Sequence, residues 1–147
     1  MDKIIWMILV LLAGAMLPIQ AGFNAKIGKE ILSPVWASLI SFVVGAASLF
    51  IYVAITKTNF QFSGIKTAPT YAWSAGTFGA FYVTIVILAY PKLGPALTFG
   101  LIVAGQLLIS IFLDHFNILV NQQHSLNWYR VIGMILILTG VLIIRKY

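Results

Sequence analysis

Amide side chains inside long apolar stretches are the residues of this sequence best placed to do chemistry. Gln20 and Asn24 lie four residues apart, which puts them on one face of a helix. Gln106 stands near the middle of another apolar stretch, and Ser110 and Asp114 follow it at the same spacing. Hydrocarbon offers an amide no hydrogen bond, so such groups turn toward protein or a water-filled cavity. We therefore expect the three amides to contact a solute; the alternative is a cap or an interhelical bond that fixes packing.

Two aromatic residues with polar handles, Trp73 and Tyr82, are further candidates for contact with a solute. Each gains from a hydrogen-bond partner when it is removed from water. The alternative is that both simply face lipid or the protein interior, as most aromatic residues in membrane spans do.

The three acidic residues are Asp2, Glu30 and Asp114, and none lies in the middle of an apolar stretch. A buried carboxylate supplies both proton exchange and a partner for organic cations, so strict proton-coupled cation export is disfavoured. Neutral or zwitterionic solutes fit better. Glu30 could couple protons if its segment were buried, but a solvated cluster with nearby lysines is favoured. Asp114 and its neighbour His115 could relay protons, but a structural pair or helix-end contact is favoured.

The remaining composition argues against other kinds of site. There is no cysteine, and two histidines with three carboxylates leave little material for a metal centre. No nucleophile–base pair or phosphate-binding glycine loop appears, so we expect neither an enzyme nor a bound cofactor or metal. The net charge of +6 comes from basic residues placed singly between apolar blocks, which indicates phospholipid headgroups rather than nucleic acid as their partner.

The elements that must position these residues are membrane-spanning helices. Hydrophobic residues make up 61% of the 147 and charged residues 8%, with a mean hydropathy of +1.03, which a water-soluble domain this small could not bury. Spans of about 20 apolar residues are needed to cross the bilayer. The sequence predicts an all-α integral membrane protein with a single domain over 1–147, its five helices at about 4–27, 34–56, 70–90, 94–115 and 129–145. The first apolar run is too long for the core of a signal peptide, which is the rival interpretation.

Small residues predict where helices approach closely. Ala72, Gly76 and Ala80 fall on one face of the third predicted span and form a small-residue seam. Gly133 and Gly140, seven residues apart, predict a flat face on the fifth span that contacts another helix across a dimer. The alternative for this glycine pair is packing within one chain.

Basic residues are divided almost evenly between the two sides of the membrane. With five spans, one side of the membrane carries four basic residues: Lys3, Lys57, Lys66 and Arg130. The other side carries five: Lys26, Lys29, Lys92, Arg145 and Lys146. Since basic residues normally accumulate on the cytoplasmic side, this balance predicts insertion in both orientations. Two oppositely inserted copies would form an inverted pair of the kind that transporters use for alternating access. The alternative is one orientation, fixed by features other than charge.

Several stretches resemble the drug/metabolite transporter superfamily, in particular its short, five-helix YdcZ-like branch. The resemblance covers essentially the whole chain, and its main stretches are Pro18–Asn24, Pro34–Ser38, Ser41–Gly45, Lys92–Ala96, Ala104–Leu107 and Asp114–Phe116. The triplet Asp114–His115–Phe116 is the most specific; Asn117 follows it where the pattern usually has glycine, and asparagine tolerates similar backbone angles. The resemblance implies half of a ten-helix inverted-repeat transporter and names no substrate.

Three classes of function follow from these observations. The first is a transporter of a small polar solute or metabolite in the bacterial inner membrane, acting as an antiparallel homodimer. The second is half of a heterodimer with an oppositely oriented paralogue. The third is a non-transporting accessory subunit, which predicts one orientation and no water-accessible cavity around Gln20 and Gln106.

Overall fold

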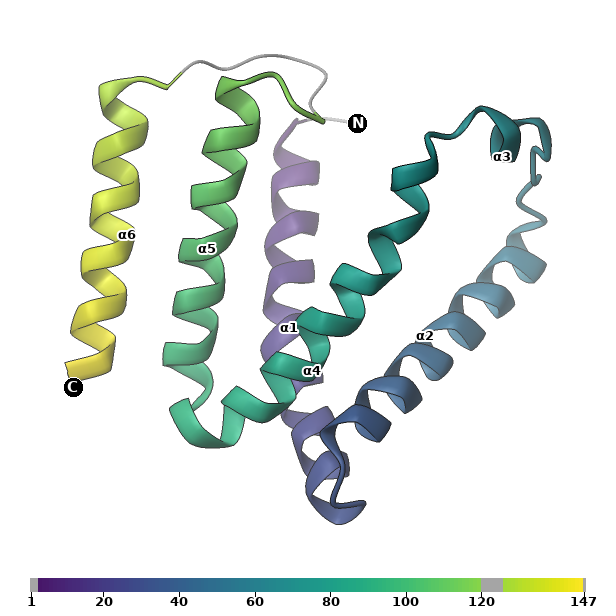
Figure 1. The fold of residues 1–147 in the computed structure, drawn as a ribbon, viewed down its shortest axis with the longest axis horizontal. Helices are drawn as coiled ribbons and strands as arrows, with labels where there is room; N and C mark the ends of the chain where they lie inside the picture. The colour runs from purple at the N-terminus through teal and green to yellow at the C-terminus, as the bar shows by residue number, and fades with distance from the viewer. Residues whose placement is uncertain (1–2, 120–125, 147) are drawn as a thin grey trace. The chain divides into compact units, whose positions relative to one another are not determined.

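The computed structural model describes residues 3–119 and 126–146, and every regular element within them is helical. In chain order these elements are α1 (Lys3–Glu30), α2 (Pro34–Thr56), α3 (Ser63–Thr67), the 3₁₀ helix η1 (Thr70–Ser74), α4 (Ala75–Leu93), α5 (Pro95–His115) and α6 (Trp128–Lys146) (Figure 1). Five stretches are long and apolar enough to cross a membrane, with η1 and α4 together forming the third. The predicted all-α membrane fold is confirmed.

Capping explains where the second span begins and ends. The backbone N–H of Trp36 donates to Ser33 Oγ at 3.3 Å, and Pro34 occupies the first turn, where its missing N–H is not needed. At the other end Lys57 adopts the left-handed conformation, with φ of 50°, and its N–H bonds to the Val53 carbonyl. These caps set the ends of α2 at Pro34 and Thr56, and α1 runs from Lys3 to Glu30.

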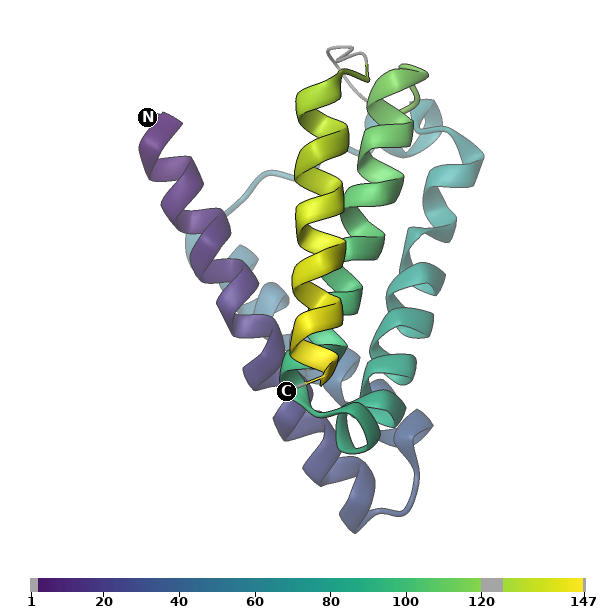
Figure 2. The same ribbon diagram turned by 90° about the vertical axis from the view of Figure 1, so that its left-hand side faces the viewer.

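The chain divides into two compact units, Met1–Lys92 and Leu93–Tyr147. In the first unit, α1 and α2 meet at the short turn between Glu30 and Pro34 and diverge from it (Figure 1). In the second unit, α5 and α6 run side by side in both views (Figure 1, Figure 2). A Cβ at Gly100 of α5 would lie 3.1 Å from Val141 Cγ2 of α6, so this glycine permits the close approach of the two helices.

Small residues also bring the helices of the first unit together. A Cβ added to Gly28 of α1 would lie 3.2 Å from Ile87 Cγ2 of α4 and 3.5 Å from Ala37 Cβ of α2. A Cβ added to Gly79 of α4 would lie 3.2 Å from Phe42 Cζ of α2. Both glycines therefore sit where a larger residue would push two helices apart.

The small residues singled out from the sequence lie elsewhere. Ala72 is in η1, and Gly76 and Ala80 are on α4; all three are exposed. A Cβ at Gly76, Gly133 or Gly140 would meet no described atom within 4 Å. Their role in helix packing or in a dimer therefore stays a prediction. Any helix that packs against them would have to come from outside the described residues of their own unit.

Candidate functional site

The polar centre of the first unit is Ser41, on α2. Its Oγ accepts a hydrogen bond from Asn24 Nδ2 at 3.1 Å and a longer one from Gln20 Nε2 at 3.5 Å. Asn24 is buried, with 6% of its surface exposed, whereas Gln20 is exposed. The two amides predicted to share a helix face therefore both reach the same hydroxyl across the α1–α2 interface. We call these three residues the amide cluster.

The amide cluster retains unused hydrogen-bonding capacity. Ser41 accepts two bonds and donates none to the described residues. The side-chain oxygens of Gln20 and Asn24 likewise accept no bond from them. One hydroxyl proton and two carbonyl oxygens thus remain for water or a solute.

A second polar contact joins α2 to α4 and has no hydroxyl proton to spare. Ser38 Oγ and Thr84 Oγ1 lie 2.9 Å apart. Each oxygen also lies within hydrogen-bonding distance of a carbonyl in its own helix, Pro34 O at 2.9 Å and Ala80 O at 2.8 Å respectively. Two hydroxyl protons serve three contacts, so none is left over. This pair is therefore a structural connection between the helices rather than a site for a solute.

A cavity of about 340 Å³ opens beside the amide cluster. It is lined by Gln20 of α1, Val83 of α4 and one face of α2, namely Ser41, Phe42, Gly45, Ala46 and Leu49. Its volume falls in the range of about 300 to 1,000 Å³ typical of small-molecule sites, which are mostly apolar with a few placed polar groups. The polar lining here is one amide and one hydroxyl, and no lining residue is charged.

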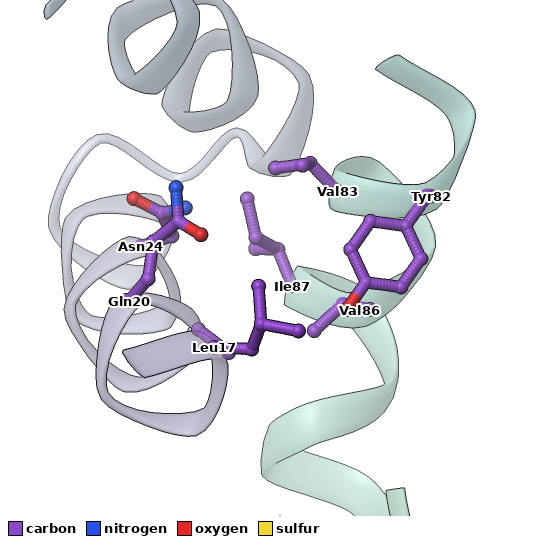
Figure 3. Close-up of a pocket in the computed structure, with 8 residues that line it drawn as sticks. Leu17, Gln20, Asn24, Tyr82, Val83, Val86 and Ile87 are labelled. Atoms are coloured by element: carbon purple, nitrogen blue, oxygen red, sulfur yellow. The ribbon is translucent and has the colours of Figure 1, made fainter. Parts of the chain in front are cut away.

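A smaller hollow adjoins the other side of the two amides. Leu17, Gln20, Ala21 and Asn24 of α1 face Tyr82, Val83, Val86 and Ile87 of α4 across it (Figure 3). Its volume of about 10 Å³ is close to the room that one water molecule needs. Gln20 lines both spaces, so its amide is the polar group best placed to turn from one space toward the other.

The structure groups some of the predicted solute contacts and not others. Gln20, Asn24 and Tyr82 lie together around the smaller hollow (Figure 3). Trp73 lies in η1 with 62% of its surface exposed and lines neither space. Gln106 lies on α5, in the second unit, where it is exposed and forms no hydrogen bond with the described residues.

The charged candidates lie at helix ends. Glu30 ends α1, is exposed, and forms no ion pair within the described part of the chain. Asp114, near the end of α5, accepts from Arg130 Nη1 at 3.0 Å, and both side chains are about a quarter exposed, at 27% and 29%. His115 Nδ1 accepts from the backbone N–H of Leu126 at 3.3 Å. Residues 3–119 and 126–146 hold no cluster of potential metal ligands.

Sequence reasoning missed two of these partnerships. It counted Arg130 as a solitary loop charge, although opposite charges at facing ends of consecutive helices were a usable signal for its pairing with Asp114. Ser41 was predictable only as part of the family stretch Ser41–Gly45. Hydroxyls in membrane helices usually bond to their own backbone, as Ser48 Oγ does to the Val44 carbonyl at 2.8 Å, so nothing in the sequence distinguished Ser41.

Comparison with known proteins places the chain in a family. Residues 5–143 match a family model described as "Putative inner membrane exporter, YdcZ". No curated protein and no solved structure matches the chain. The match confirms the resemblance that the sequence stretches indicated, and it extends from the first span into the fifth. The chain therefore belongs to the YdcZ family of drug/metabolite transporters, and it is a multi-pass inner-membrane transporter.

Proposed function

We propose that this transporter moves a small, uncharged or zwitterionic polar solute, and that it does so as an antiparallel homodimer. The observation that carries the proposal is the cavity beside the amide cluster, which is large enough for a small organic molecule and offers only Gln20 and Ser41 as polar lining. An ion with net charge would enter an apolar space without a counterion, which is strongly unfavourable. A solute with hydroxyl, amide or carbonyl groups would find matching partners there.

The two amides have different parts in this proposal. Asn24 is buried and makes the shorter bond, so it holds α1 against α2. Gln20 is exposed and its bond of 3.5 Å is at the weak limit of hydrogen bonding. A solute could replace that bond at little cost, and Gln20 would then swing from Ser41 to the solute. Gln20 and Ser41 are therefore the proposed solute contacts.

The homodimer supplies the second half of the inverted repeat. Five spans per chain and the near-even division of basic residues support insertion in both orientations. Two antiparallel copies would bring ten spans together, with one amide cluster from each, and would alternate access by rocking against each other.

Cysteine accessibility tests whether the cavity is a solute path. Ala46 lines the cavity and its neighbour Ala47 does not, so the two alanines form a matched pair at the same depth of α2. Because the chain has no native cysteine, each can be replaced singly in an unmodified background. A hydrophilic thiol reagent should label Ala46→Cys in intact membranes and leave Ala47→Cys largely unlabelled. Equal labelling of the two would remove the evidence for a water-accessible path.

Orientation is tested separately with Gln61→Cys, in the exposed connection between α2 and η1. The substitution leaves the charge balance unchanged. An impermeant thiol reagent applied to cells should label about half of the protein, and the rest only after permeabilisation. Labelling of all or none before permeabilisation would reject the antiparallel homodimer and favour a paralogue partner or an accessory role.

A further inference from the structure

Of the amides in the spans, Gln106 is the one that forms no hydrogen bond with another described residue. Three amide side chains lie within membrane-spanning helices, and two of them share Ser41. Gln106 is exposed on α5 and bonds to none of the described residues. An amide carries two donors and two acceptor sites. In hydrocarbon these would stay unsatisfied at a cost of several kcal/mol for a fully unpaired group, so Gln106 does not face lipid in the working protein.

The depth of Gln106 in the membrane limits which groups can form hydrogen bonds with its amide. The helix α5 has 21 residues from Pro95 to His115, so its central residue is Gly105 and Gln106 is the next. In an antiparallel dimer the two-fold axis lies in the membrane plane, and a helix crossing its own copy at that axis does so at mid-depth. Only residues at the centre of a span can then meet the same residue of the other copy. Gln106 is at that position.

We infer that Gln106 pairs with Gln106 of a second copy on the two-fold axis of the dimer. A primary amide is self-complementary: Nε2–H of each copy donates to Oε1 of the other, giving two equivalent bonds. Gly105 beside it has open space where a Cβ would stand, which leaves room for a second helix. The inference rests on the antiparallel homodimer proposed above and assigns α5 as the helix that crosses at its axis.

The symmetry makes a prediction that no parallel dimer shares. About an axis at Gln106, the residue one turn before it meets the residue one turn after it, so Ile102 of one copy lies beside Ser110 of the other. Two copies of Ser110 are instead displaced by about 12 Å along the membrane normal, twice the rise of four residues. In a parallel dimer, each residue would lie beside its own copy at every depth.

Cross-linking of single-cysteine chains tests this arrangement. Membranes are treated with a short, membrane-permeant bifunctional methanethiosulfonate, and dimers are counted on denaturing gels. Gln106→Cys should form cross-linked dimers. Ile102→Cys and Ser110→Cys should each give none alone but should cross-link when the two chains are co-expressed, and this mixed pair keeps Gln106 intact. The inference is overturned if the mixed pair gives no product, or if Ser110→Cys alone cross-links as well as Gln106→Cys.

The outcomes also separate this inference from the proposed function. Half-labelling at Gln61→Cys without the mixed cross-link would leave the antiparallel dimer standing and reject α5 as its axial helix. A single orientation at Gln61→Cys would reject both. In a second measurement, Gln106→Leu removes both bonds of the pair and should weaken association of labelled chains in vesicles by about eight- to three-hundredfold, the range expected from two interhelical hydrogen bonds. Unchanged association would reject the amide pair.

Discussion

Replacing Ser41 with alanine should weaken the first unit by about 1 to 2 kcal/mol. The substitution removes the hydrogen-bond acceptor of both amides, but the two lost bonds contribute differently to stability. Gln20 is exposed and its bond is 3.5 Å long, so its loss contributes little. Asn24 is 6% exposed, and its Nδ2 would lose its partner, Ser41 Oγ at 3.1 Å. An unsatisfied buried donor costs about 1 to 3 kcal/mol, and interhelical hydrogen bonds measured in membranes contribute up to about 1.7 kcal/mol. The expected loss of about 1 to 2 kcal/mol is where these two ranges overlap.

Reversible unfolding in mixed micelles, driven by the mole fraction of a denaturing detergent, measures this change. Ser48→Ala is the matched control, because Ser48 lies on the same helix but bonds only to its own backbone, at Val44 O. The control should change stability by less than about 0.5 kcal/mol. A double-mutant cycle with Asn24→Ala should give a coupling energy close to the full effect of Ser41→Ala. Equal losses in Ser41→Ala and Ser48→Ala, or strict additivity in the cycle, would refute the role given to Ser41.

Two further substitutions test packing and charge. Gly28→Ala should destabilise the first unit by about 1 to 3 kcal/mol, because its Cβ would lie 3.2 Å from Ile87; Gly14→Ala, in open space on the same helix, should be neutral or slightly stabilising in the same unfolding assay. Asp114→Asn should lower the stability of the second unit by less than about 1 kcal/mol, since the pair with Arg130 is partly exposed, and the loss should shrink in high salt. A loss several times larger, or one insensitive to salt, would mean that this pair is buried by a partner.

The spans were predictable because membrane helices are marked by continuous apolar length. Hydrocarbon requires every backbone group to be bonded within its own helix, so about 20 apolar residues predict a helix without any knowledge of its neighbours. The start of α2 carries a recognisable signal, because Ser33 can cap the helix and Pro34 suits its first turn. The 3₁₀ turn that opens the third span, Thr70–Ser74, left no comparable signal.

The candidate site was predictable only in part. Gln20 and Asn24 stood out because amides are rare in apolar runs, and their spacing gave a shared face. Their acceptor could not be named, because the register of α1 against α2 is set by close contacts such as that of Gly28 with Ala37. Glycine and alanine recur throughout the sequence, and most of the glycines, Gly14 and Gly45 among them, have open space around them. The same ambiguity explains why the small-residue seam was placed at Gly76 while a close approach occurs at Gly79.

Polar groups carry most of the information about assembly in a chain of this kind. An apolar side chain is equally stable against lipid and against another apolar helix, so exposed residues such as Phe50 and Leu142 do not distinguish a lipid-facing surface from an interface. An amide does distinguish them, because lipid cannot bond to it. By this criterion Asn24 and Gln20 mark the interface between α1 and α2, where both bond to Ser41. Gln106 bonds to none of the described residues, and on this ground we infer that it lies at an interface with a second copy.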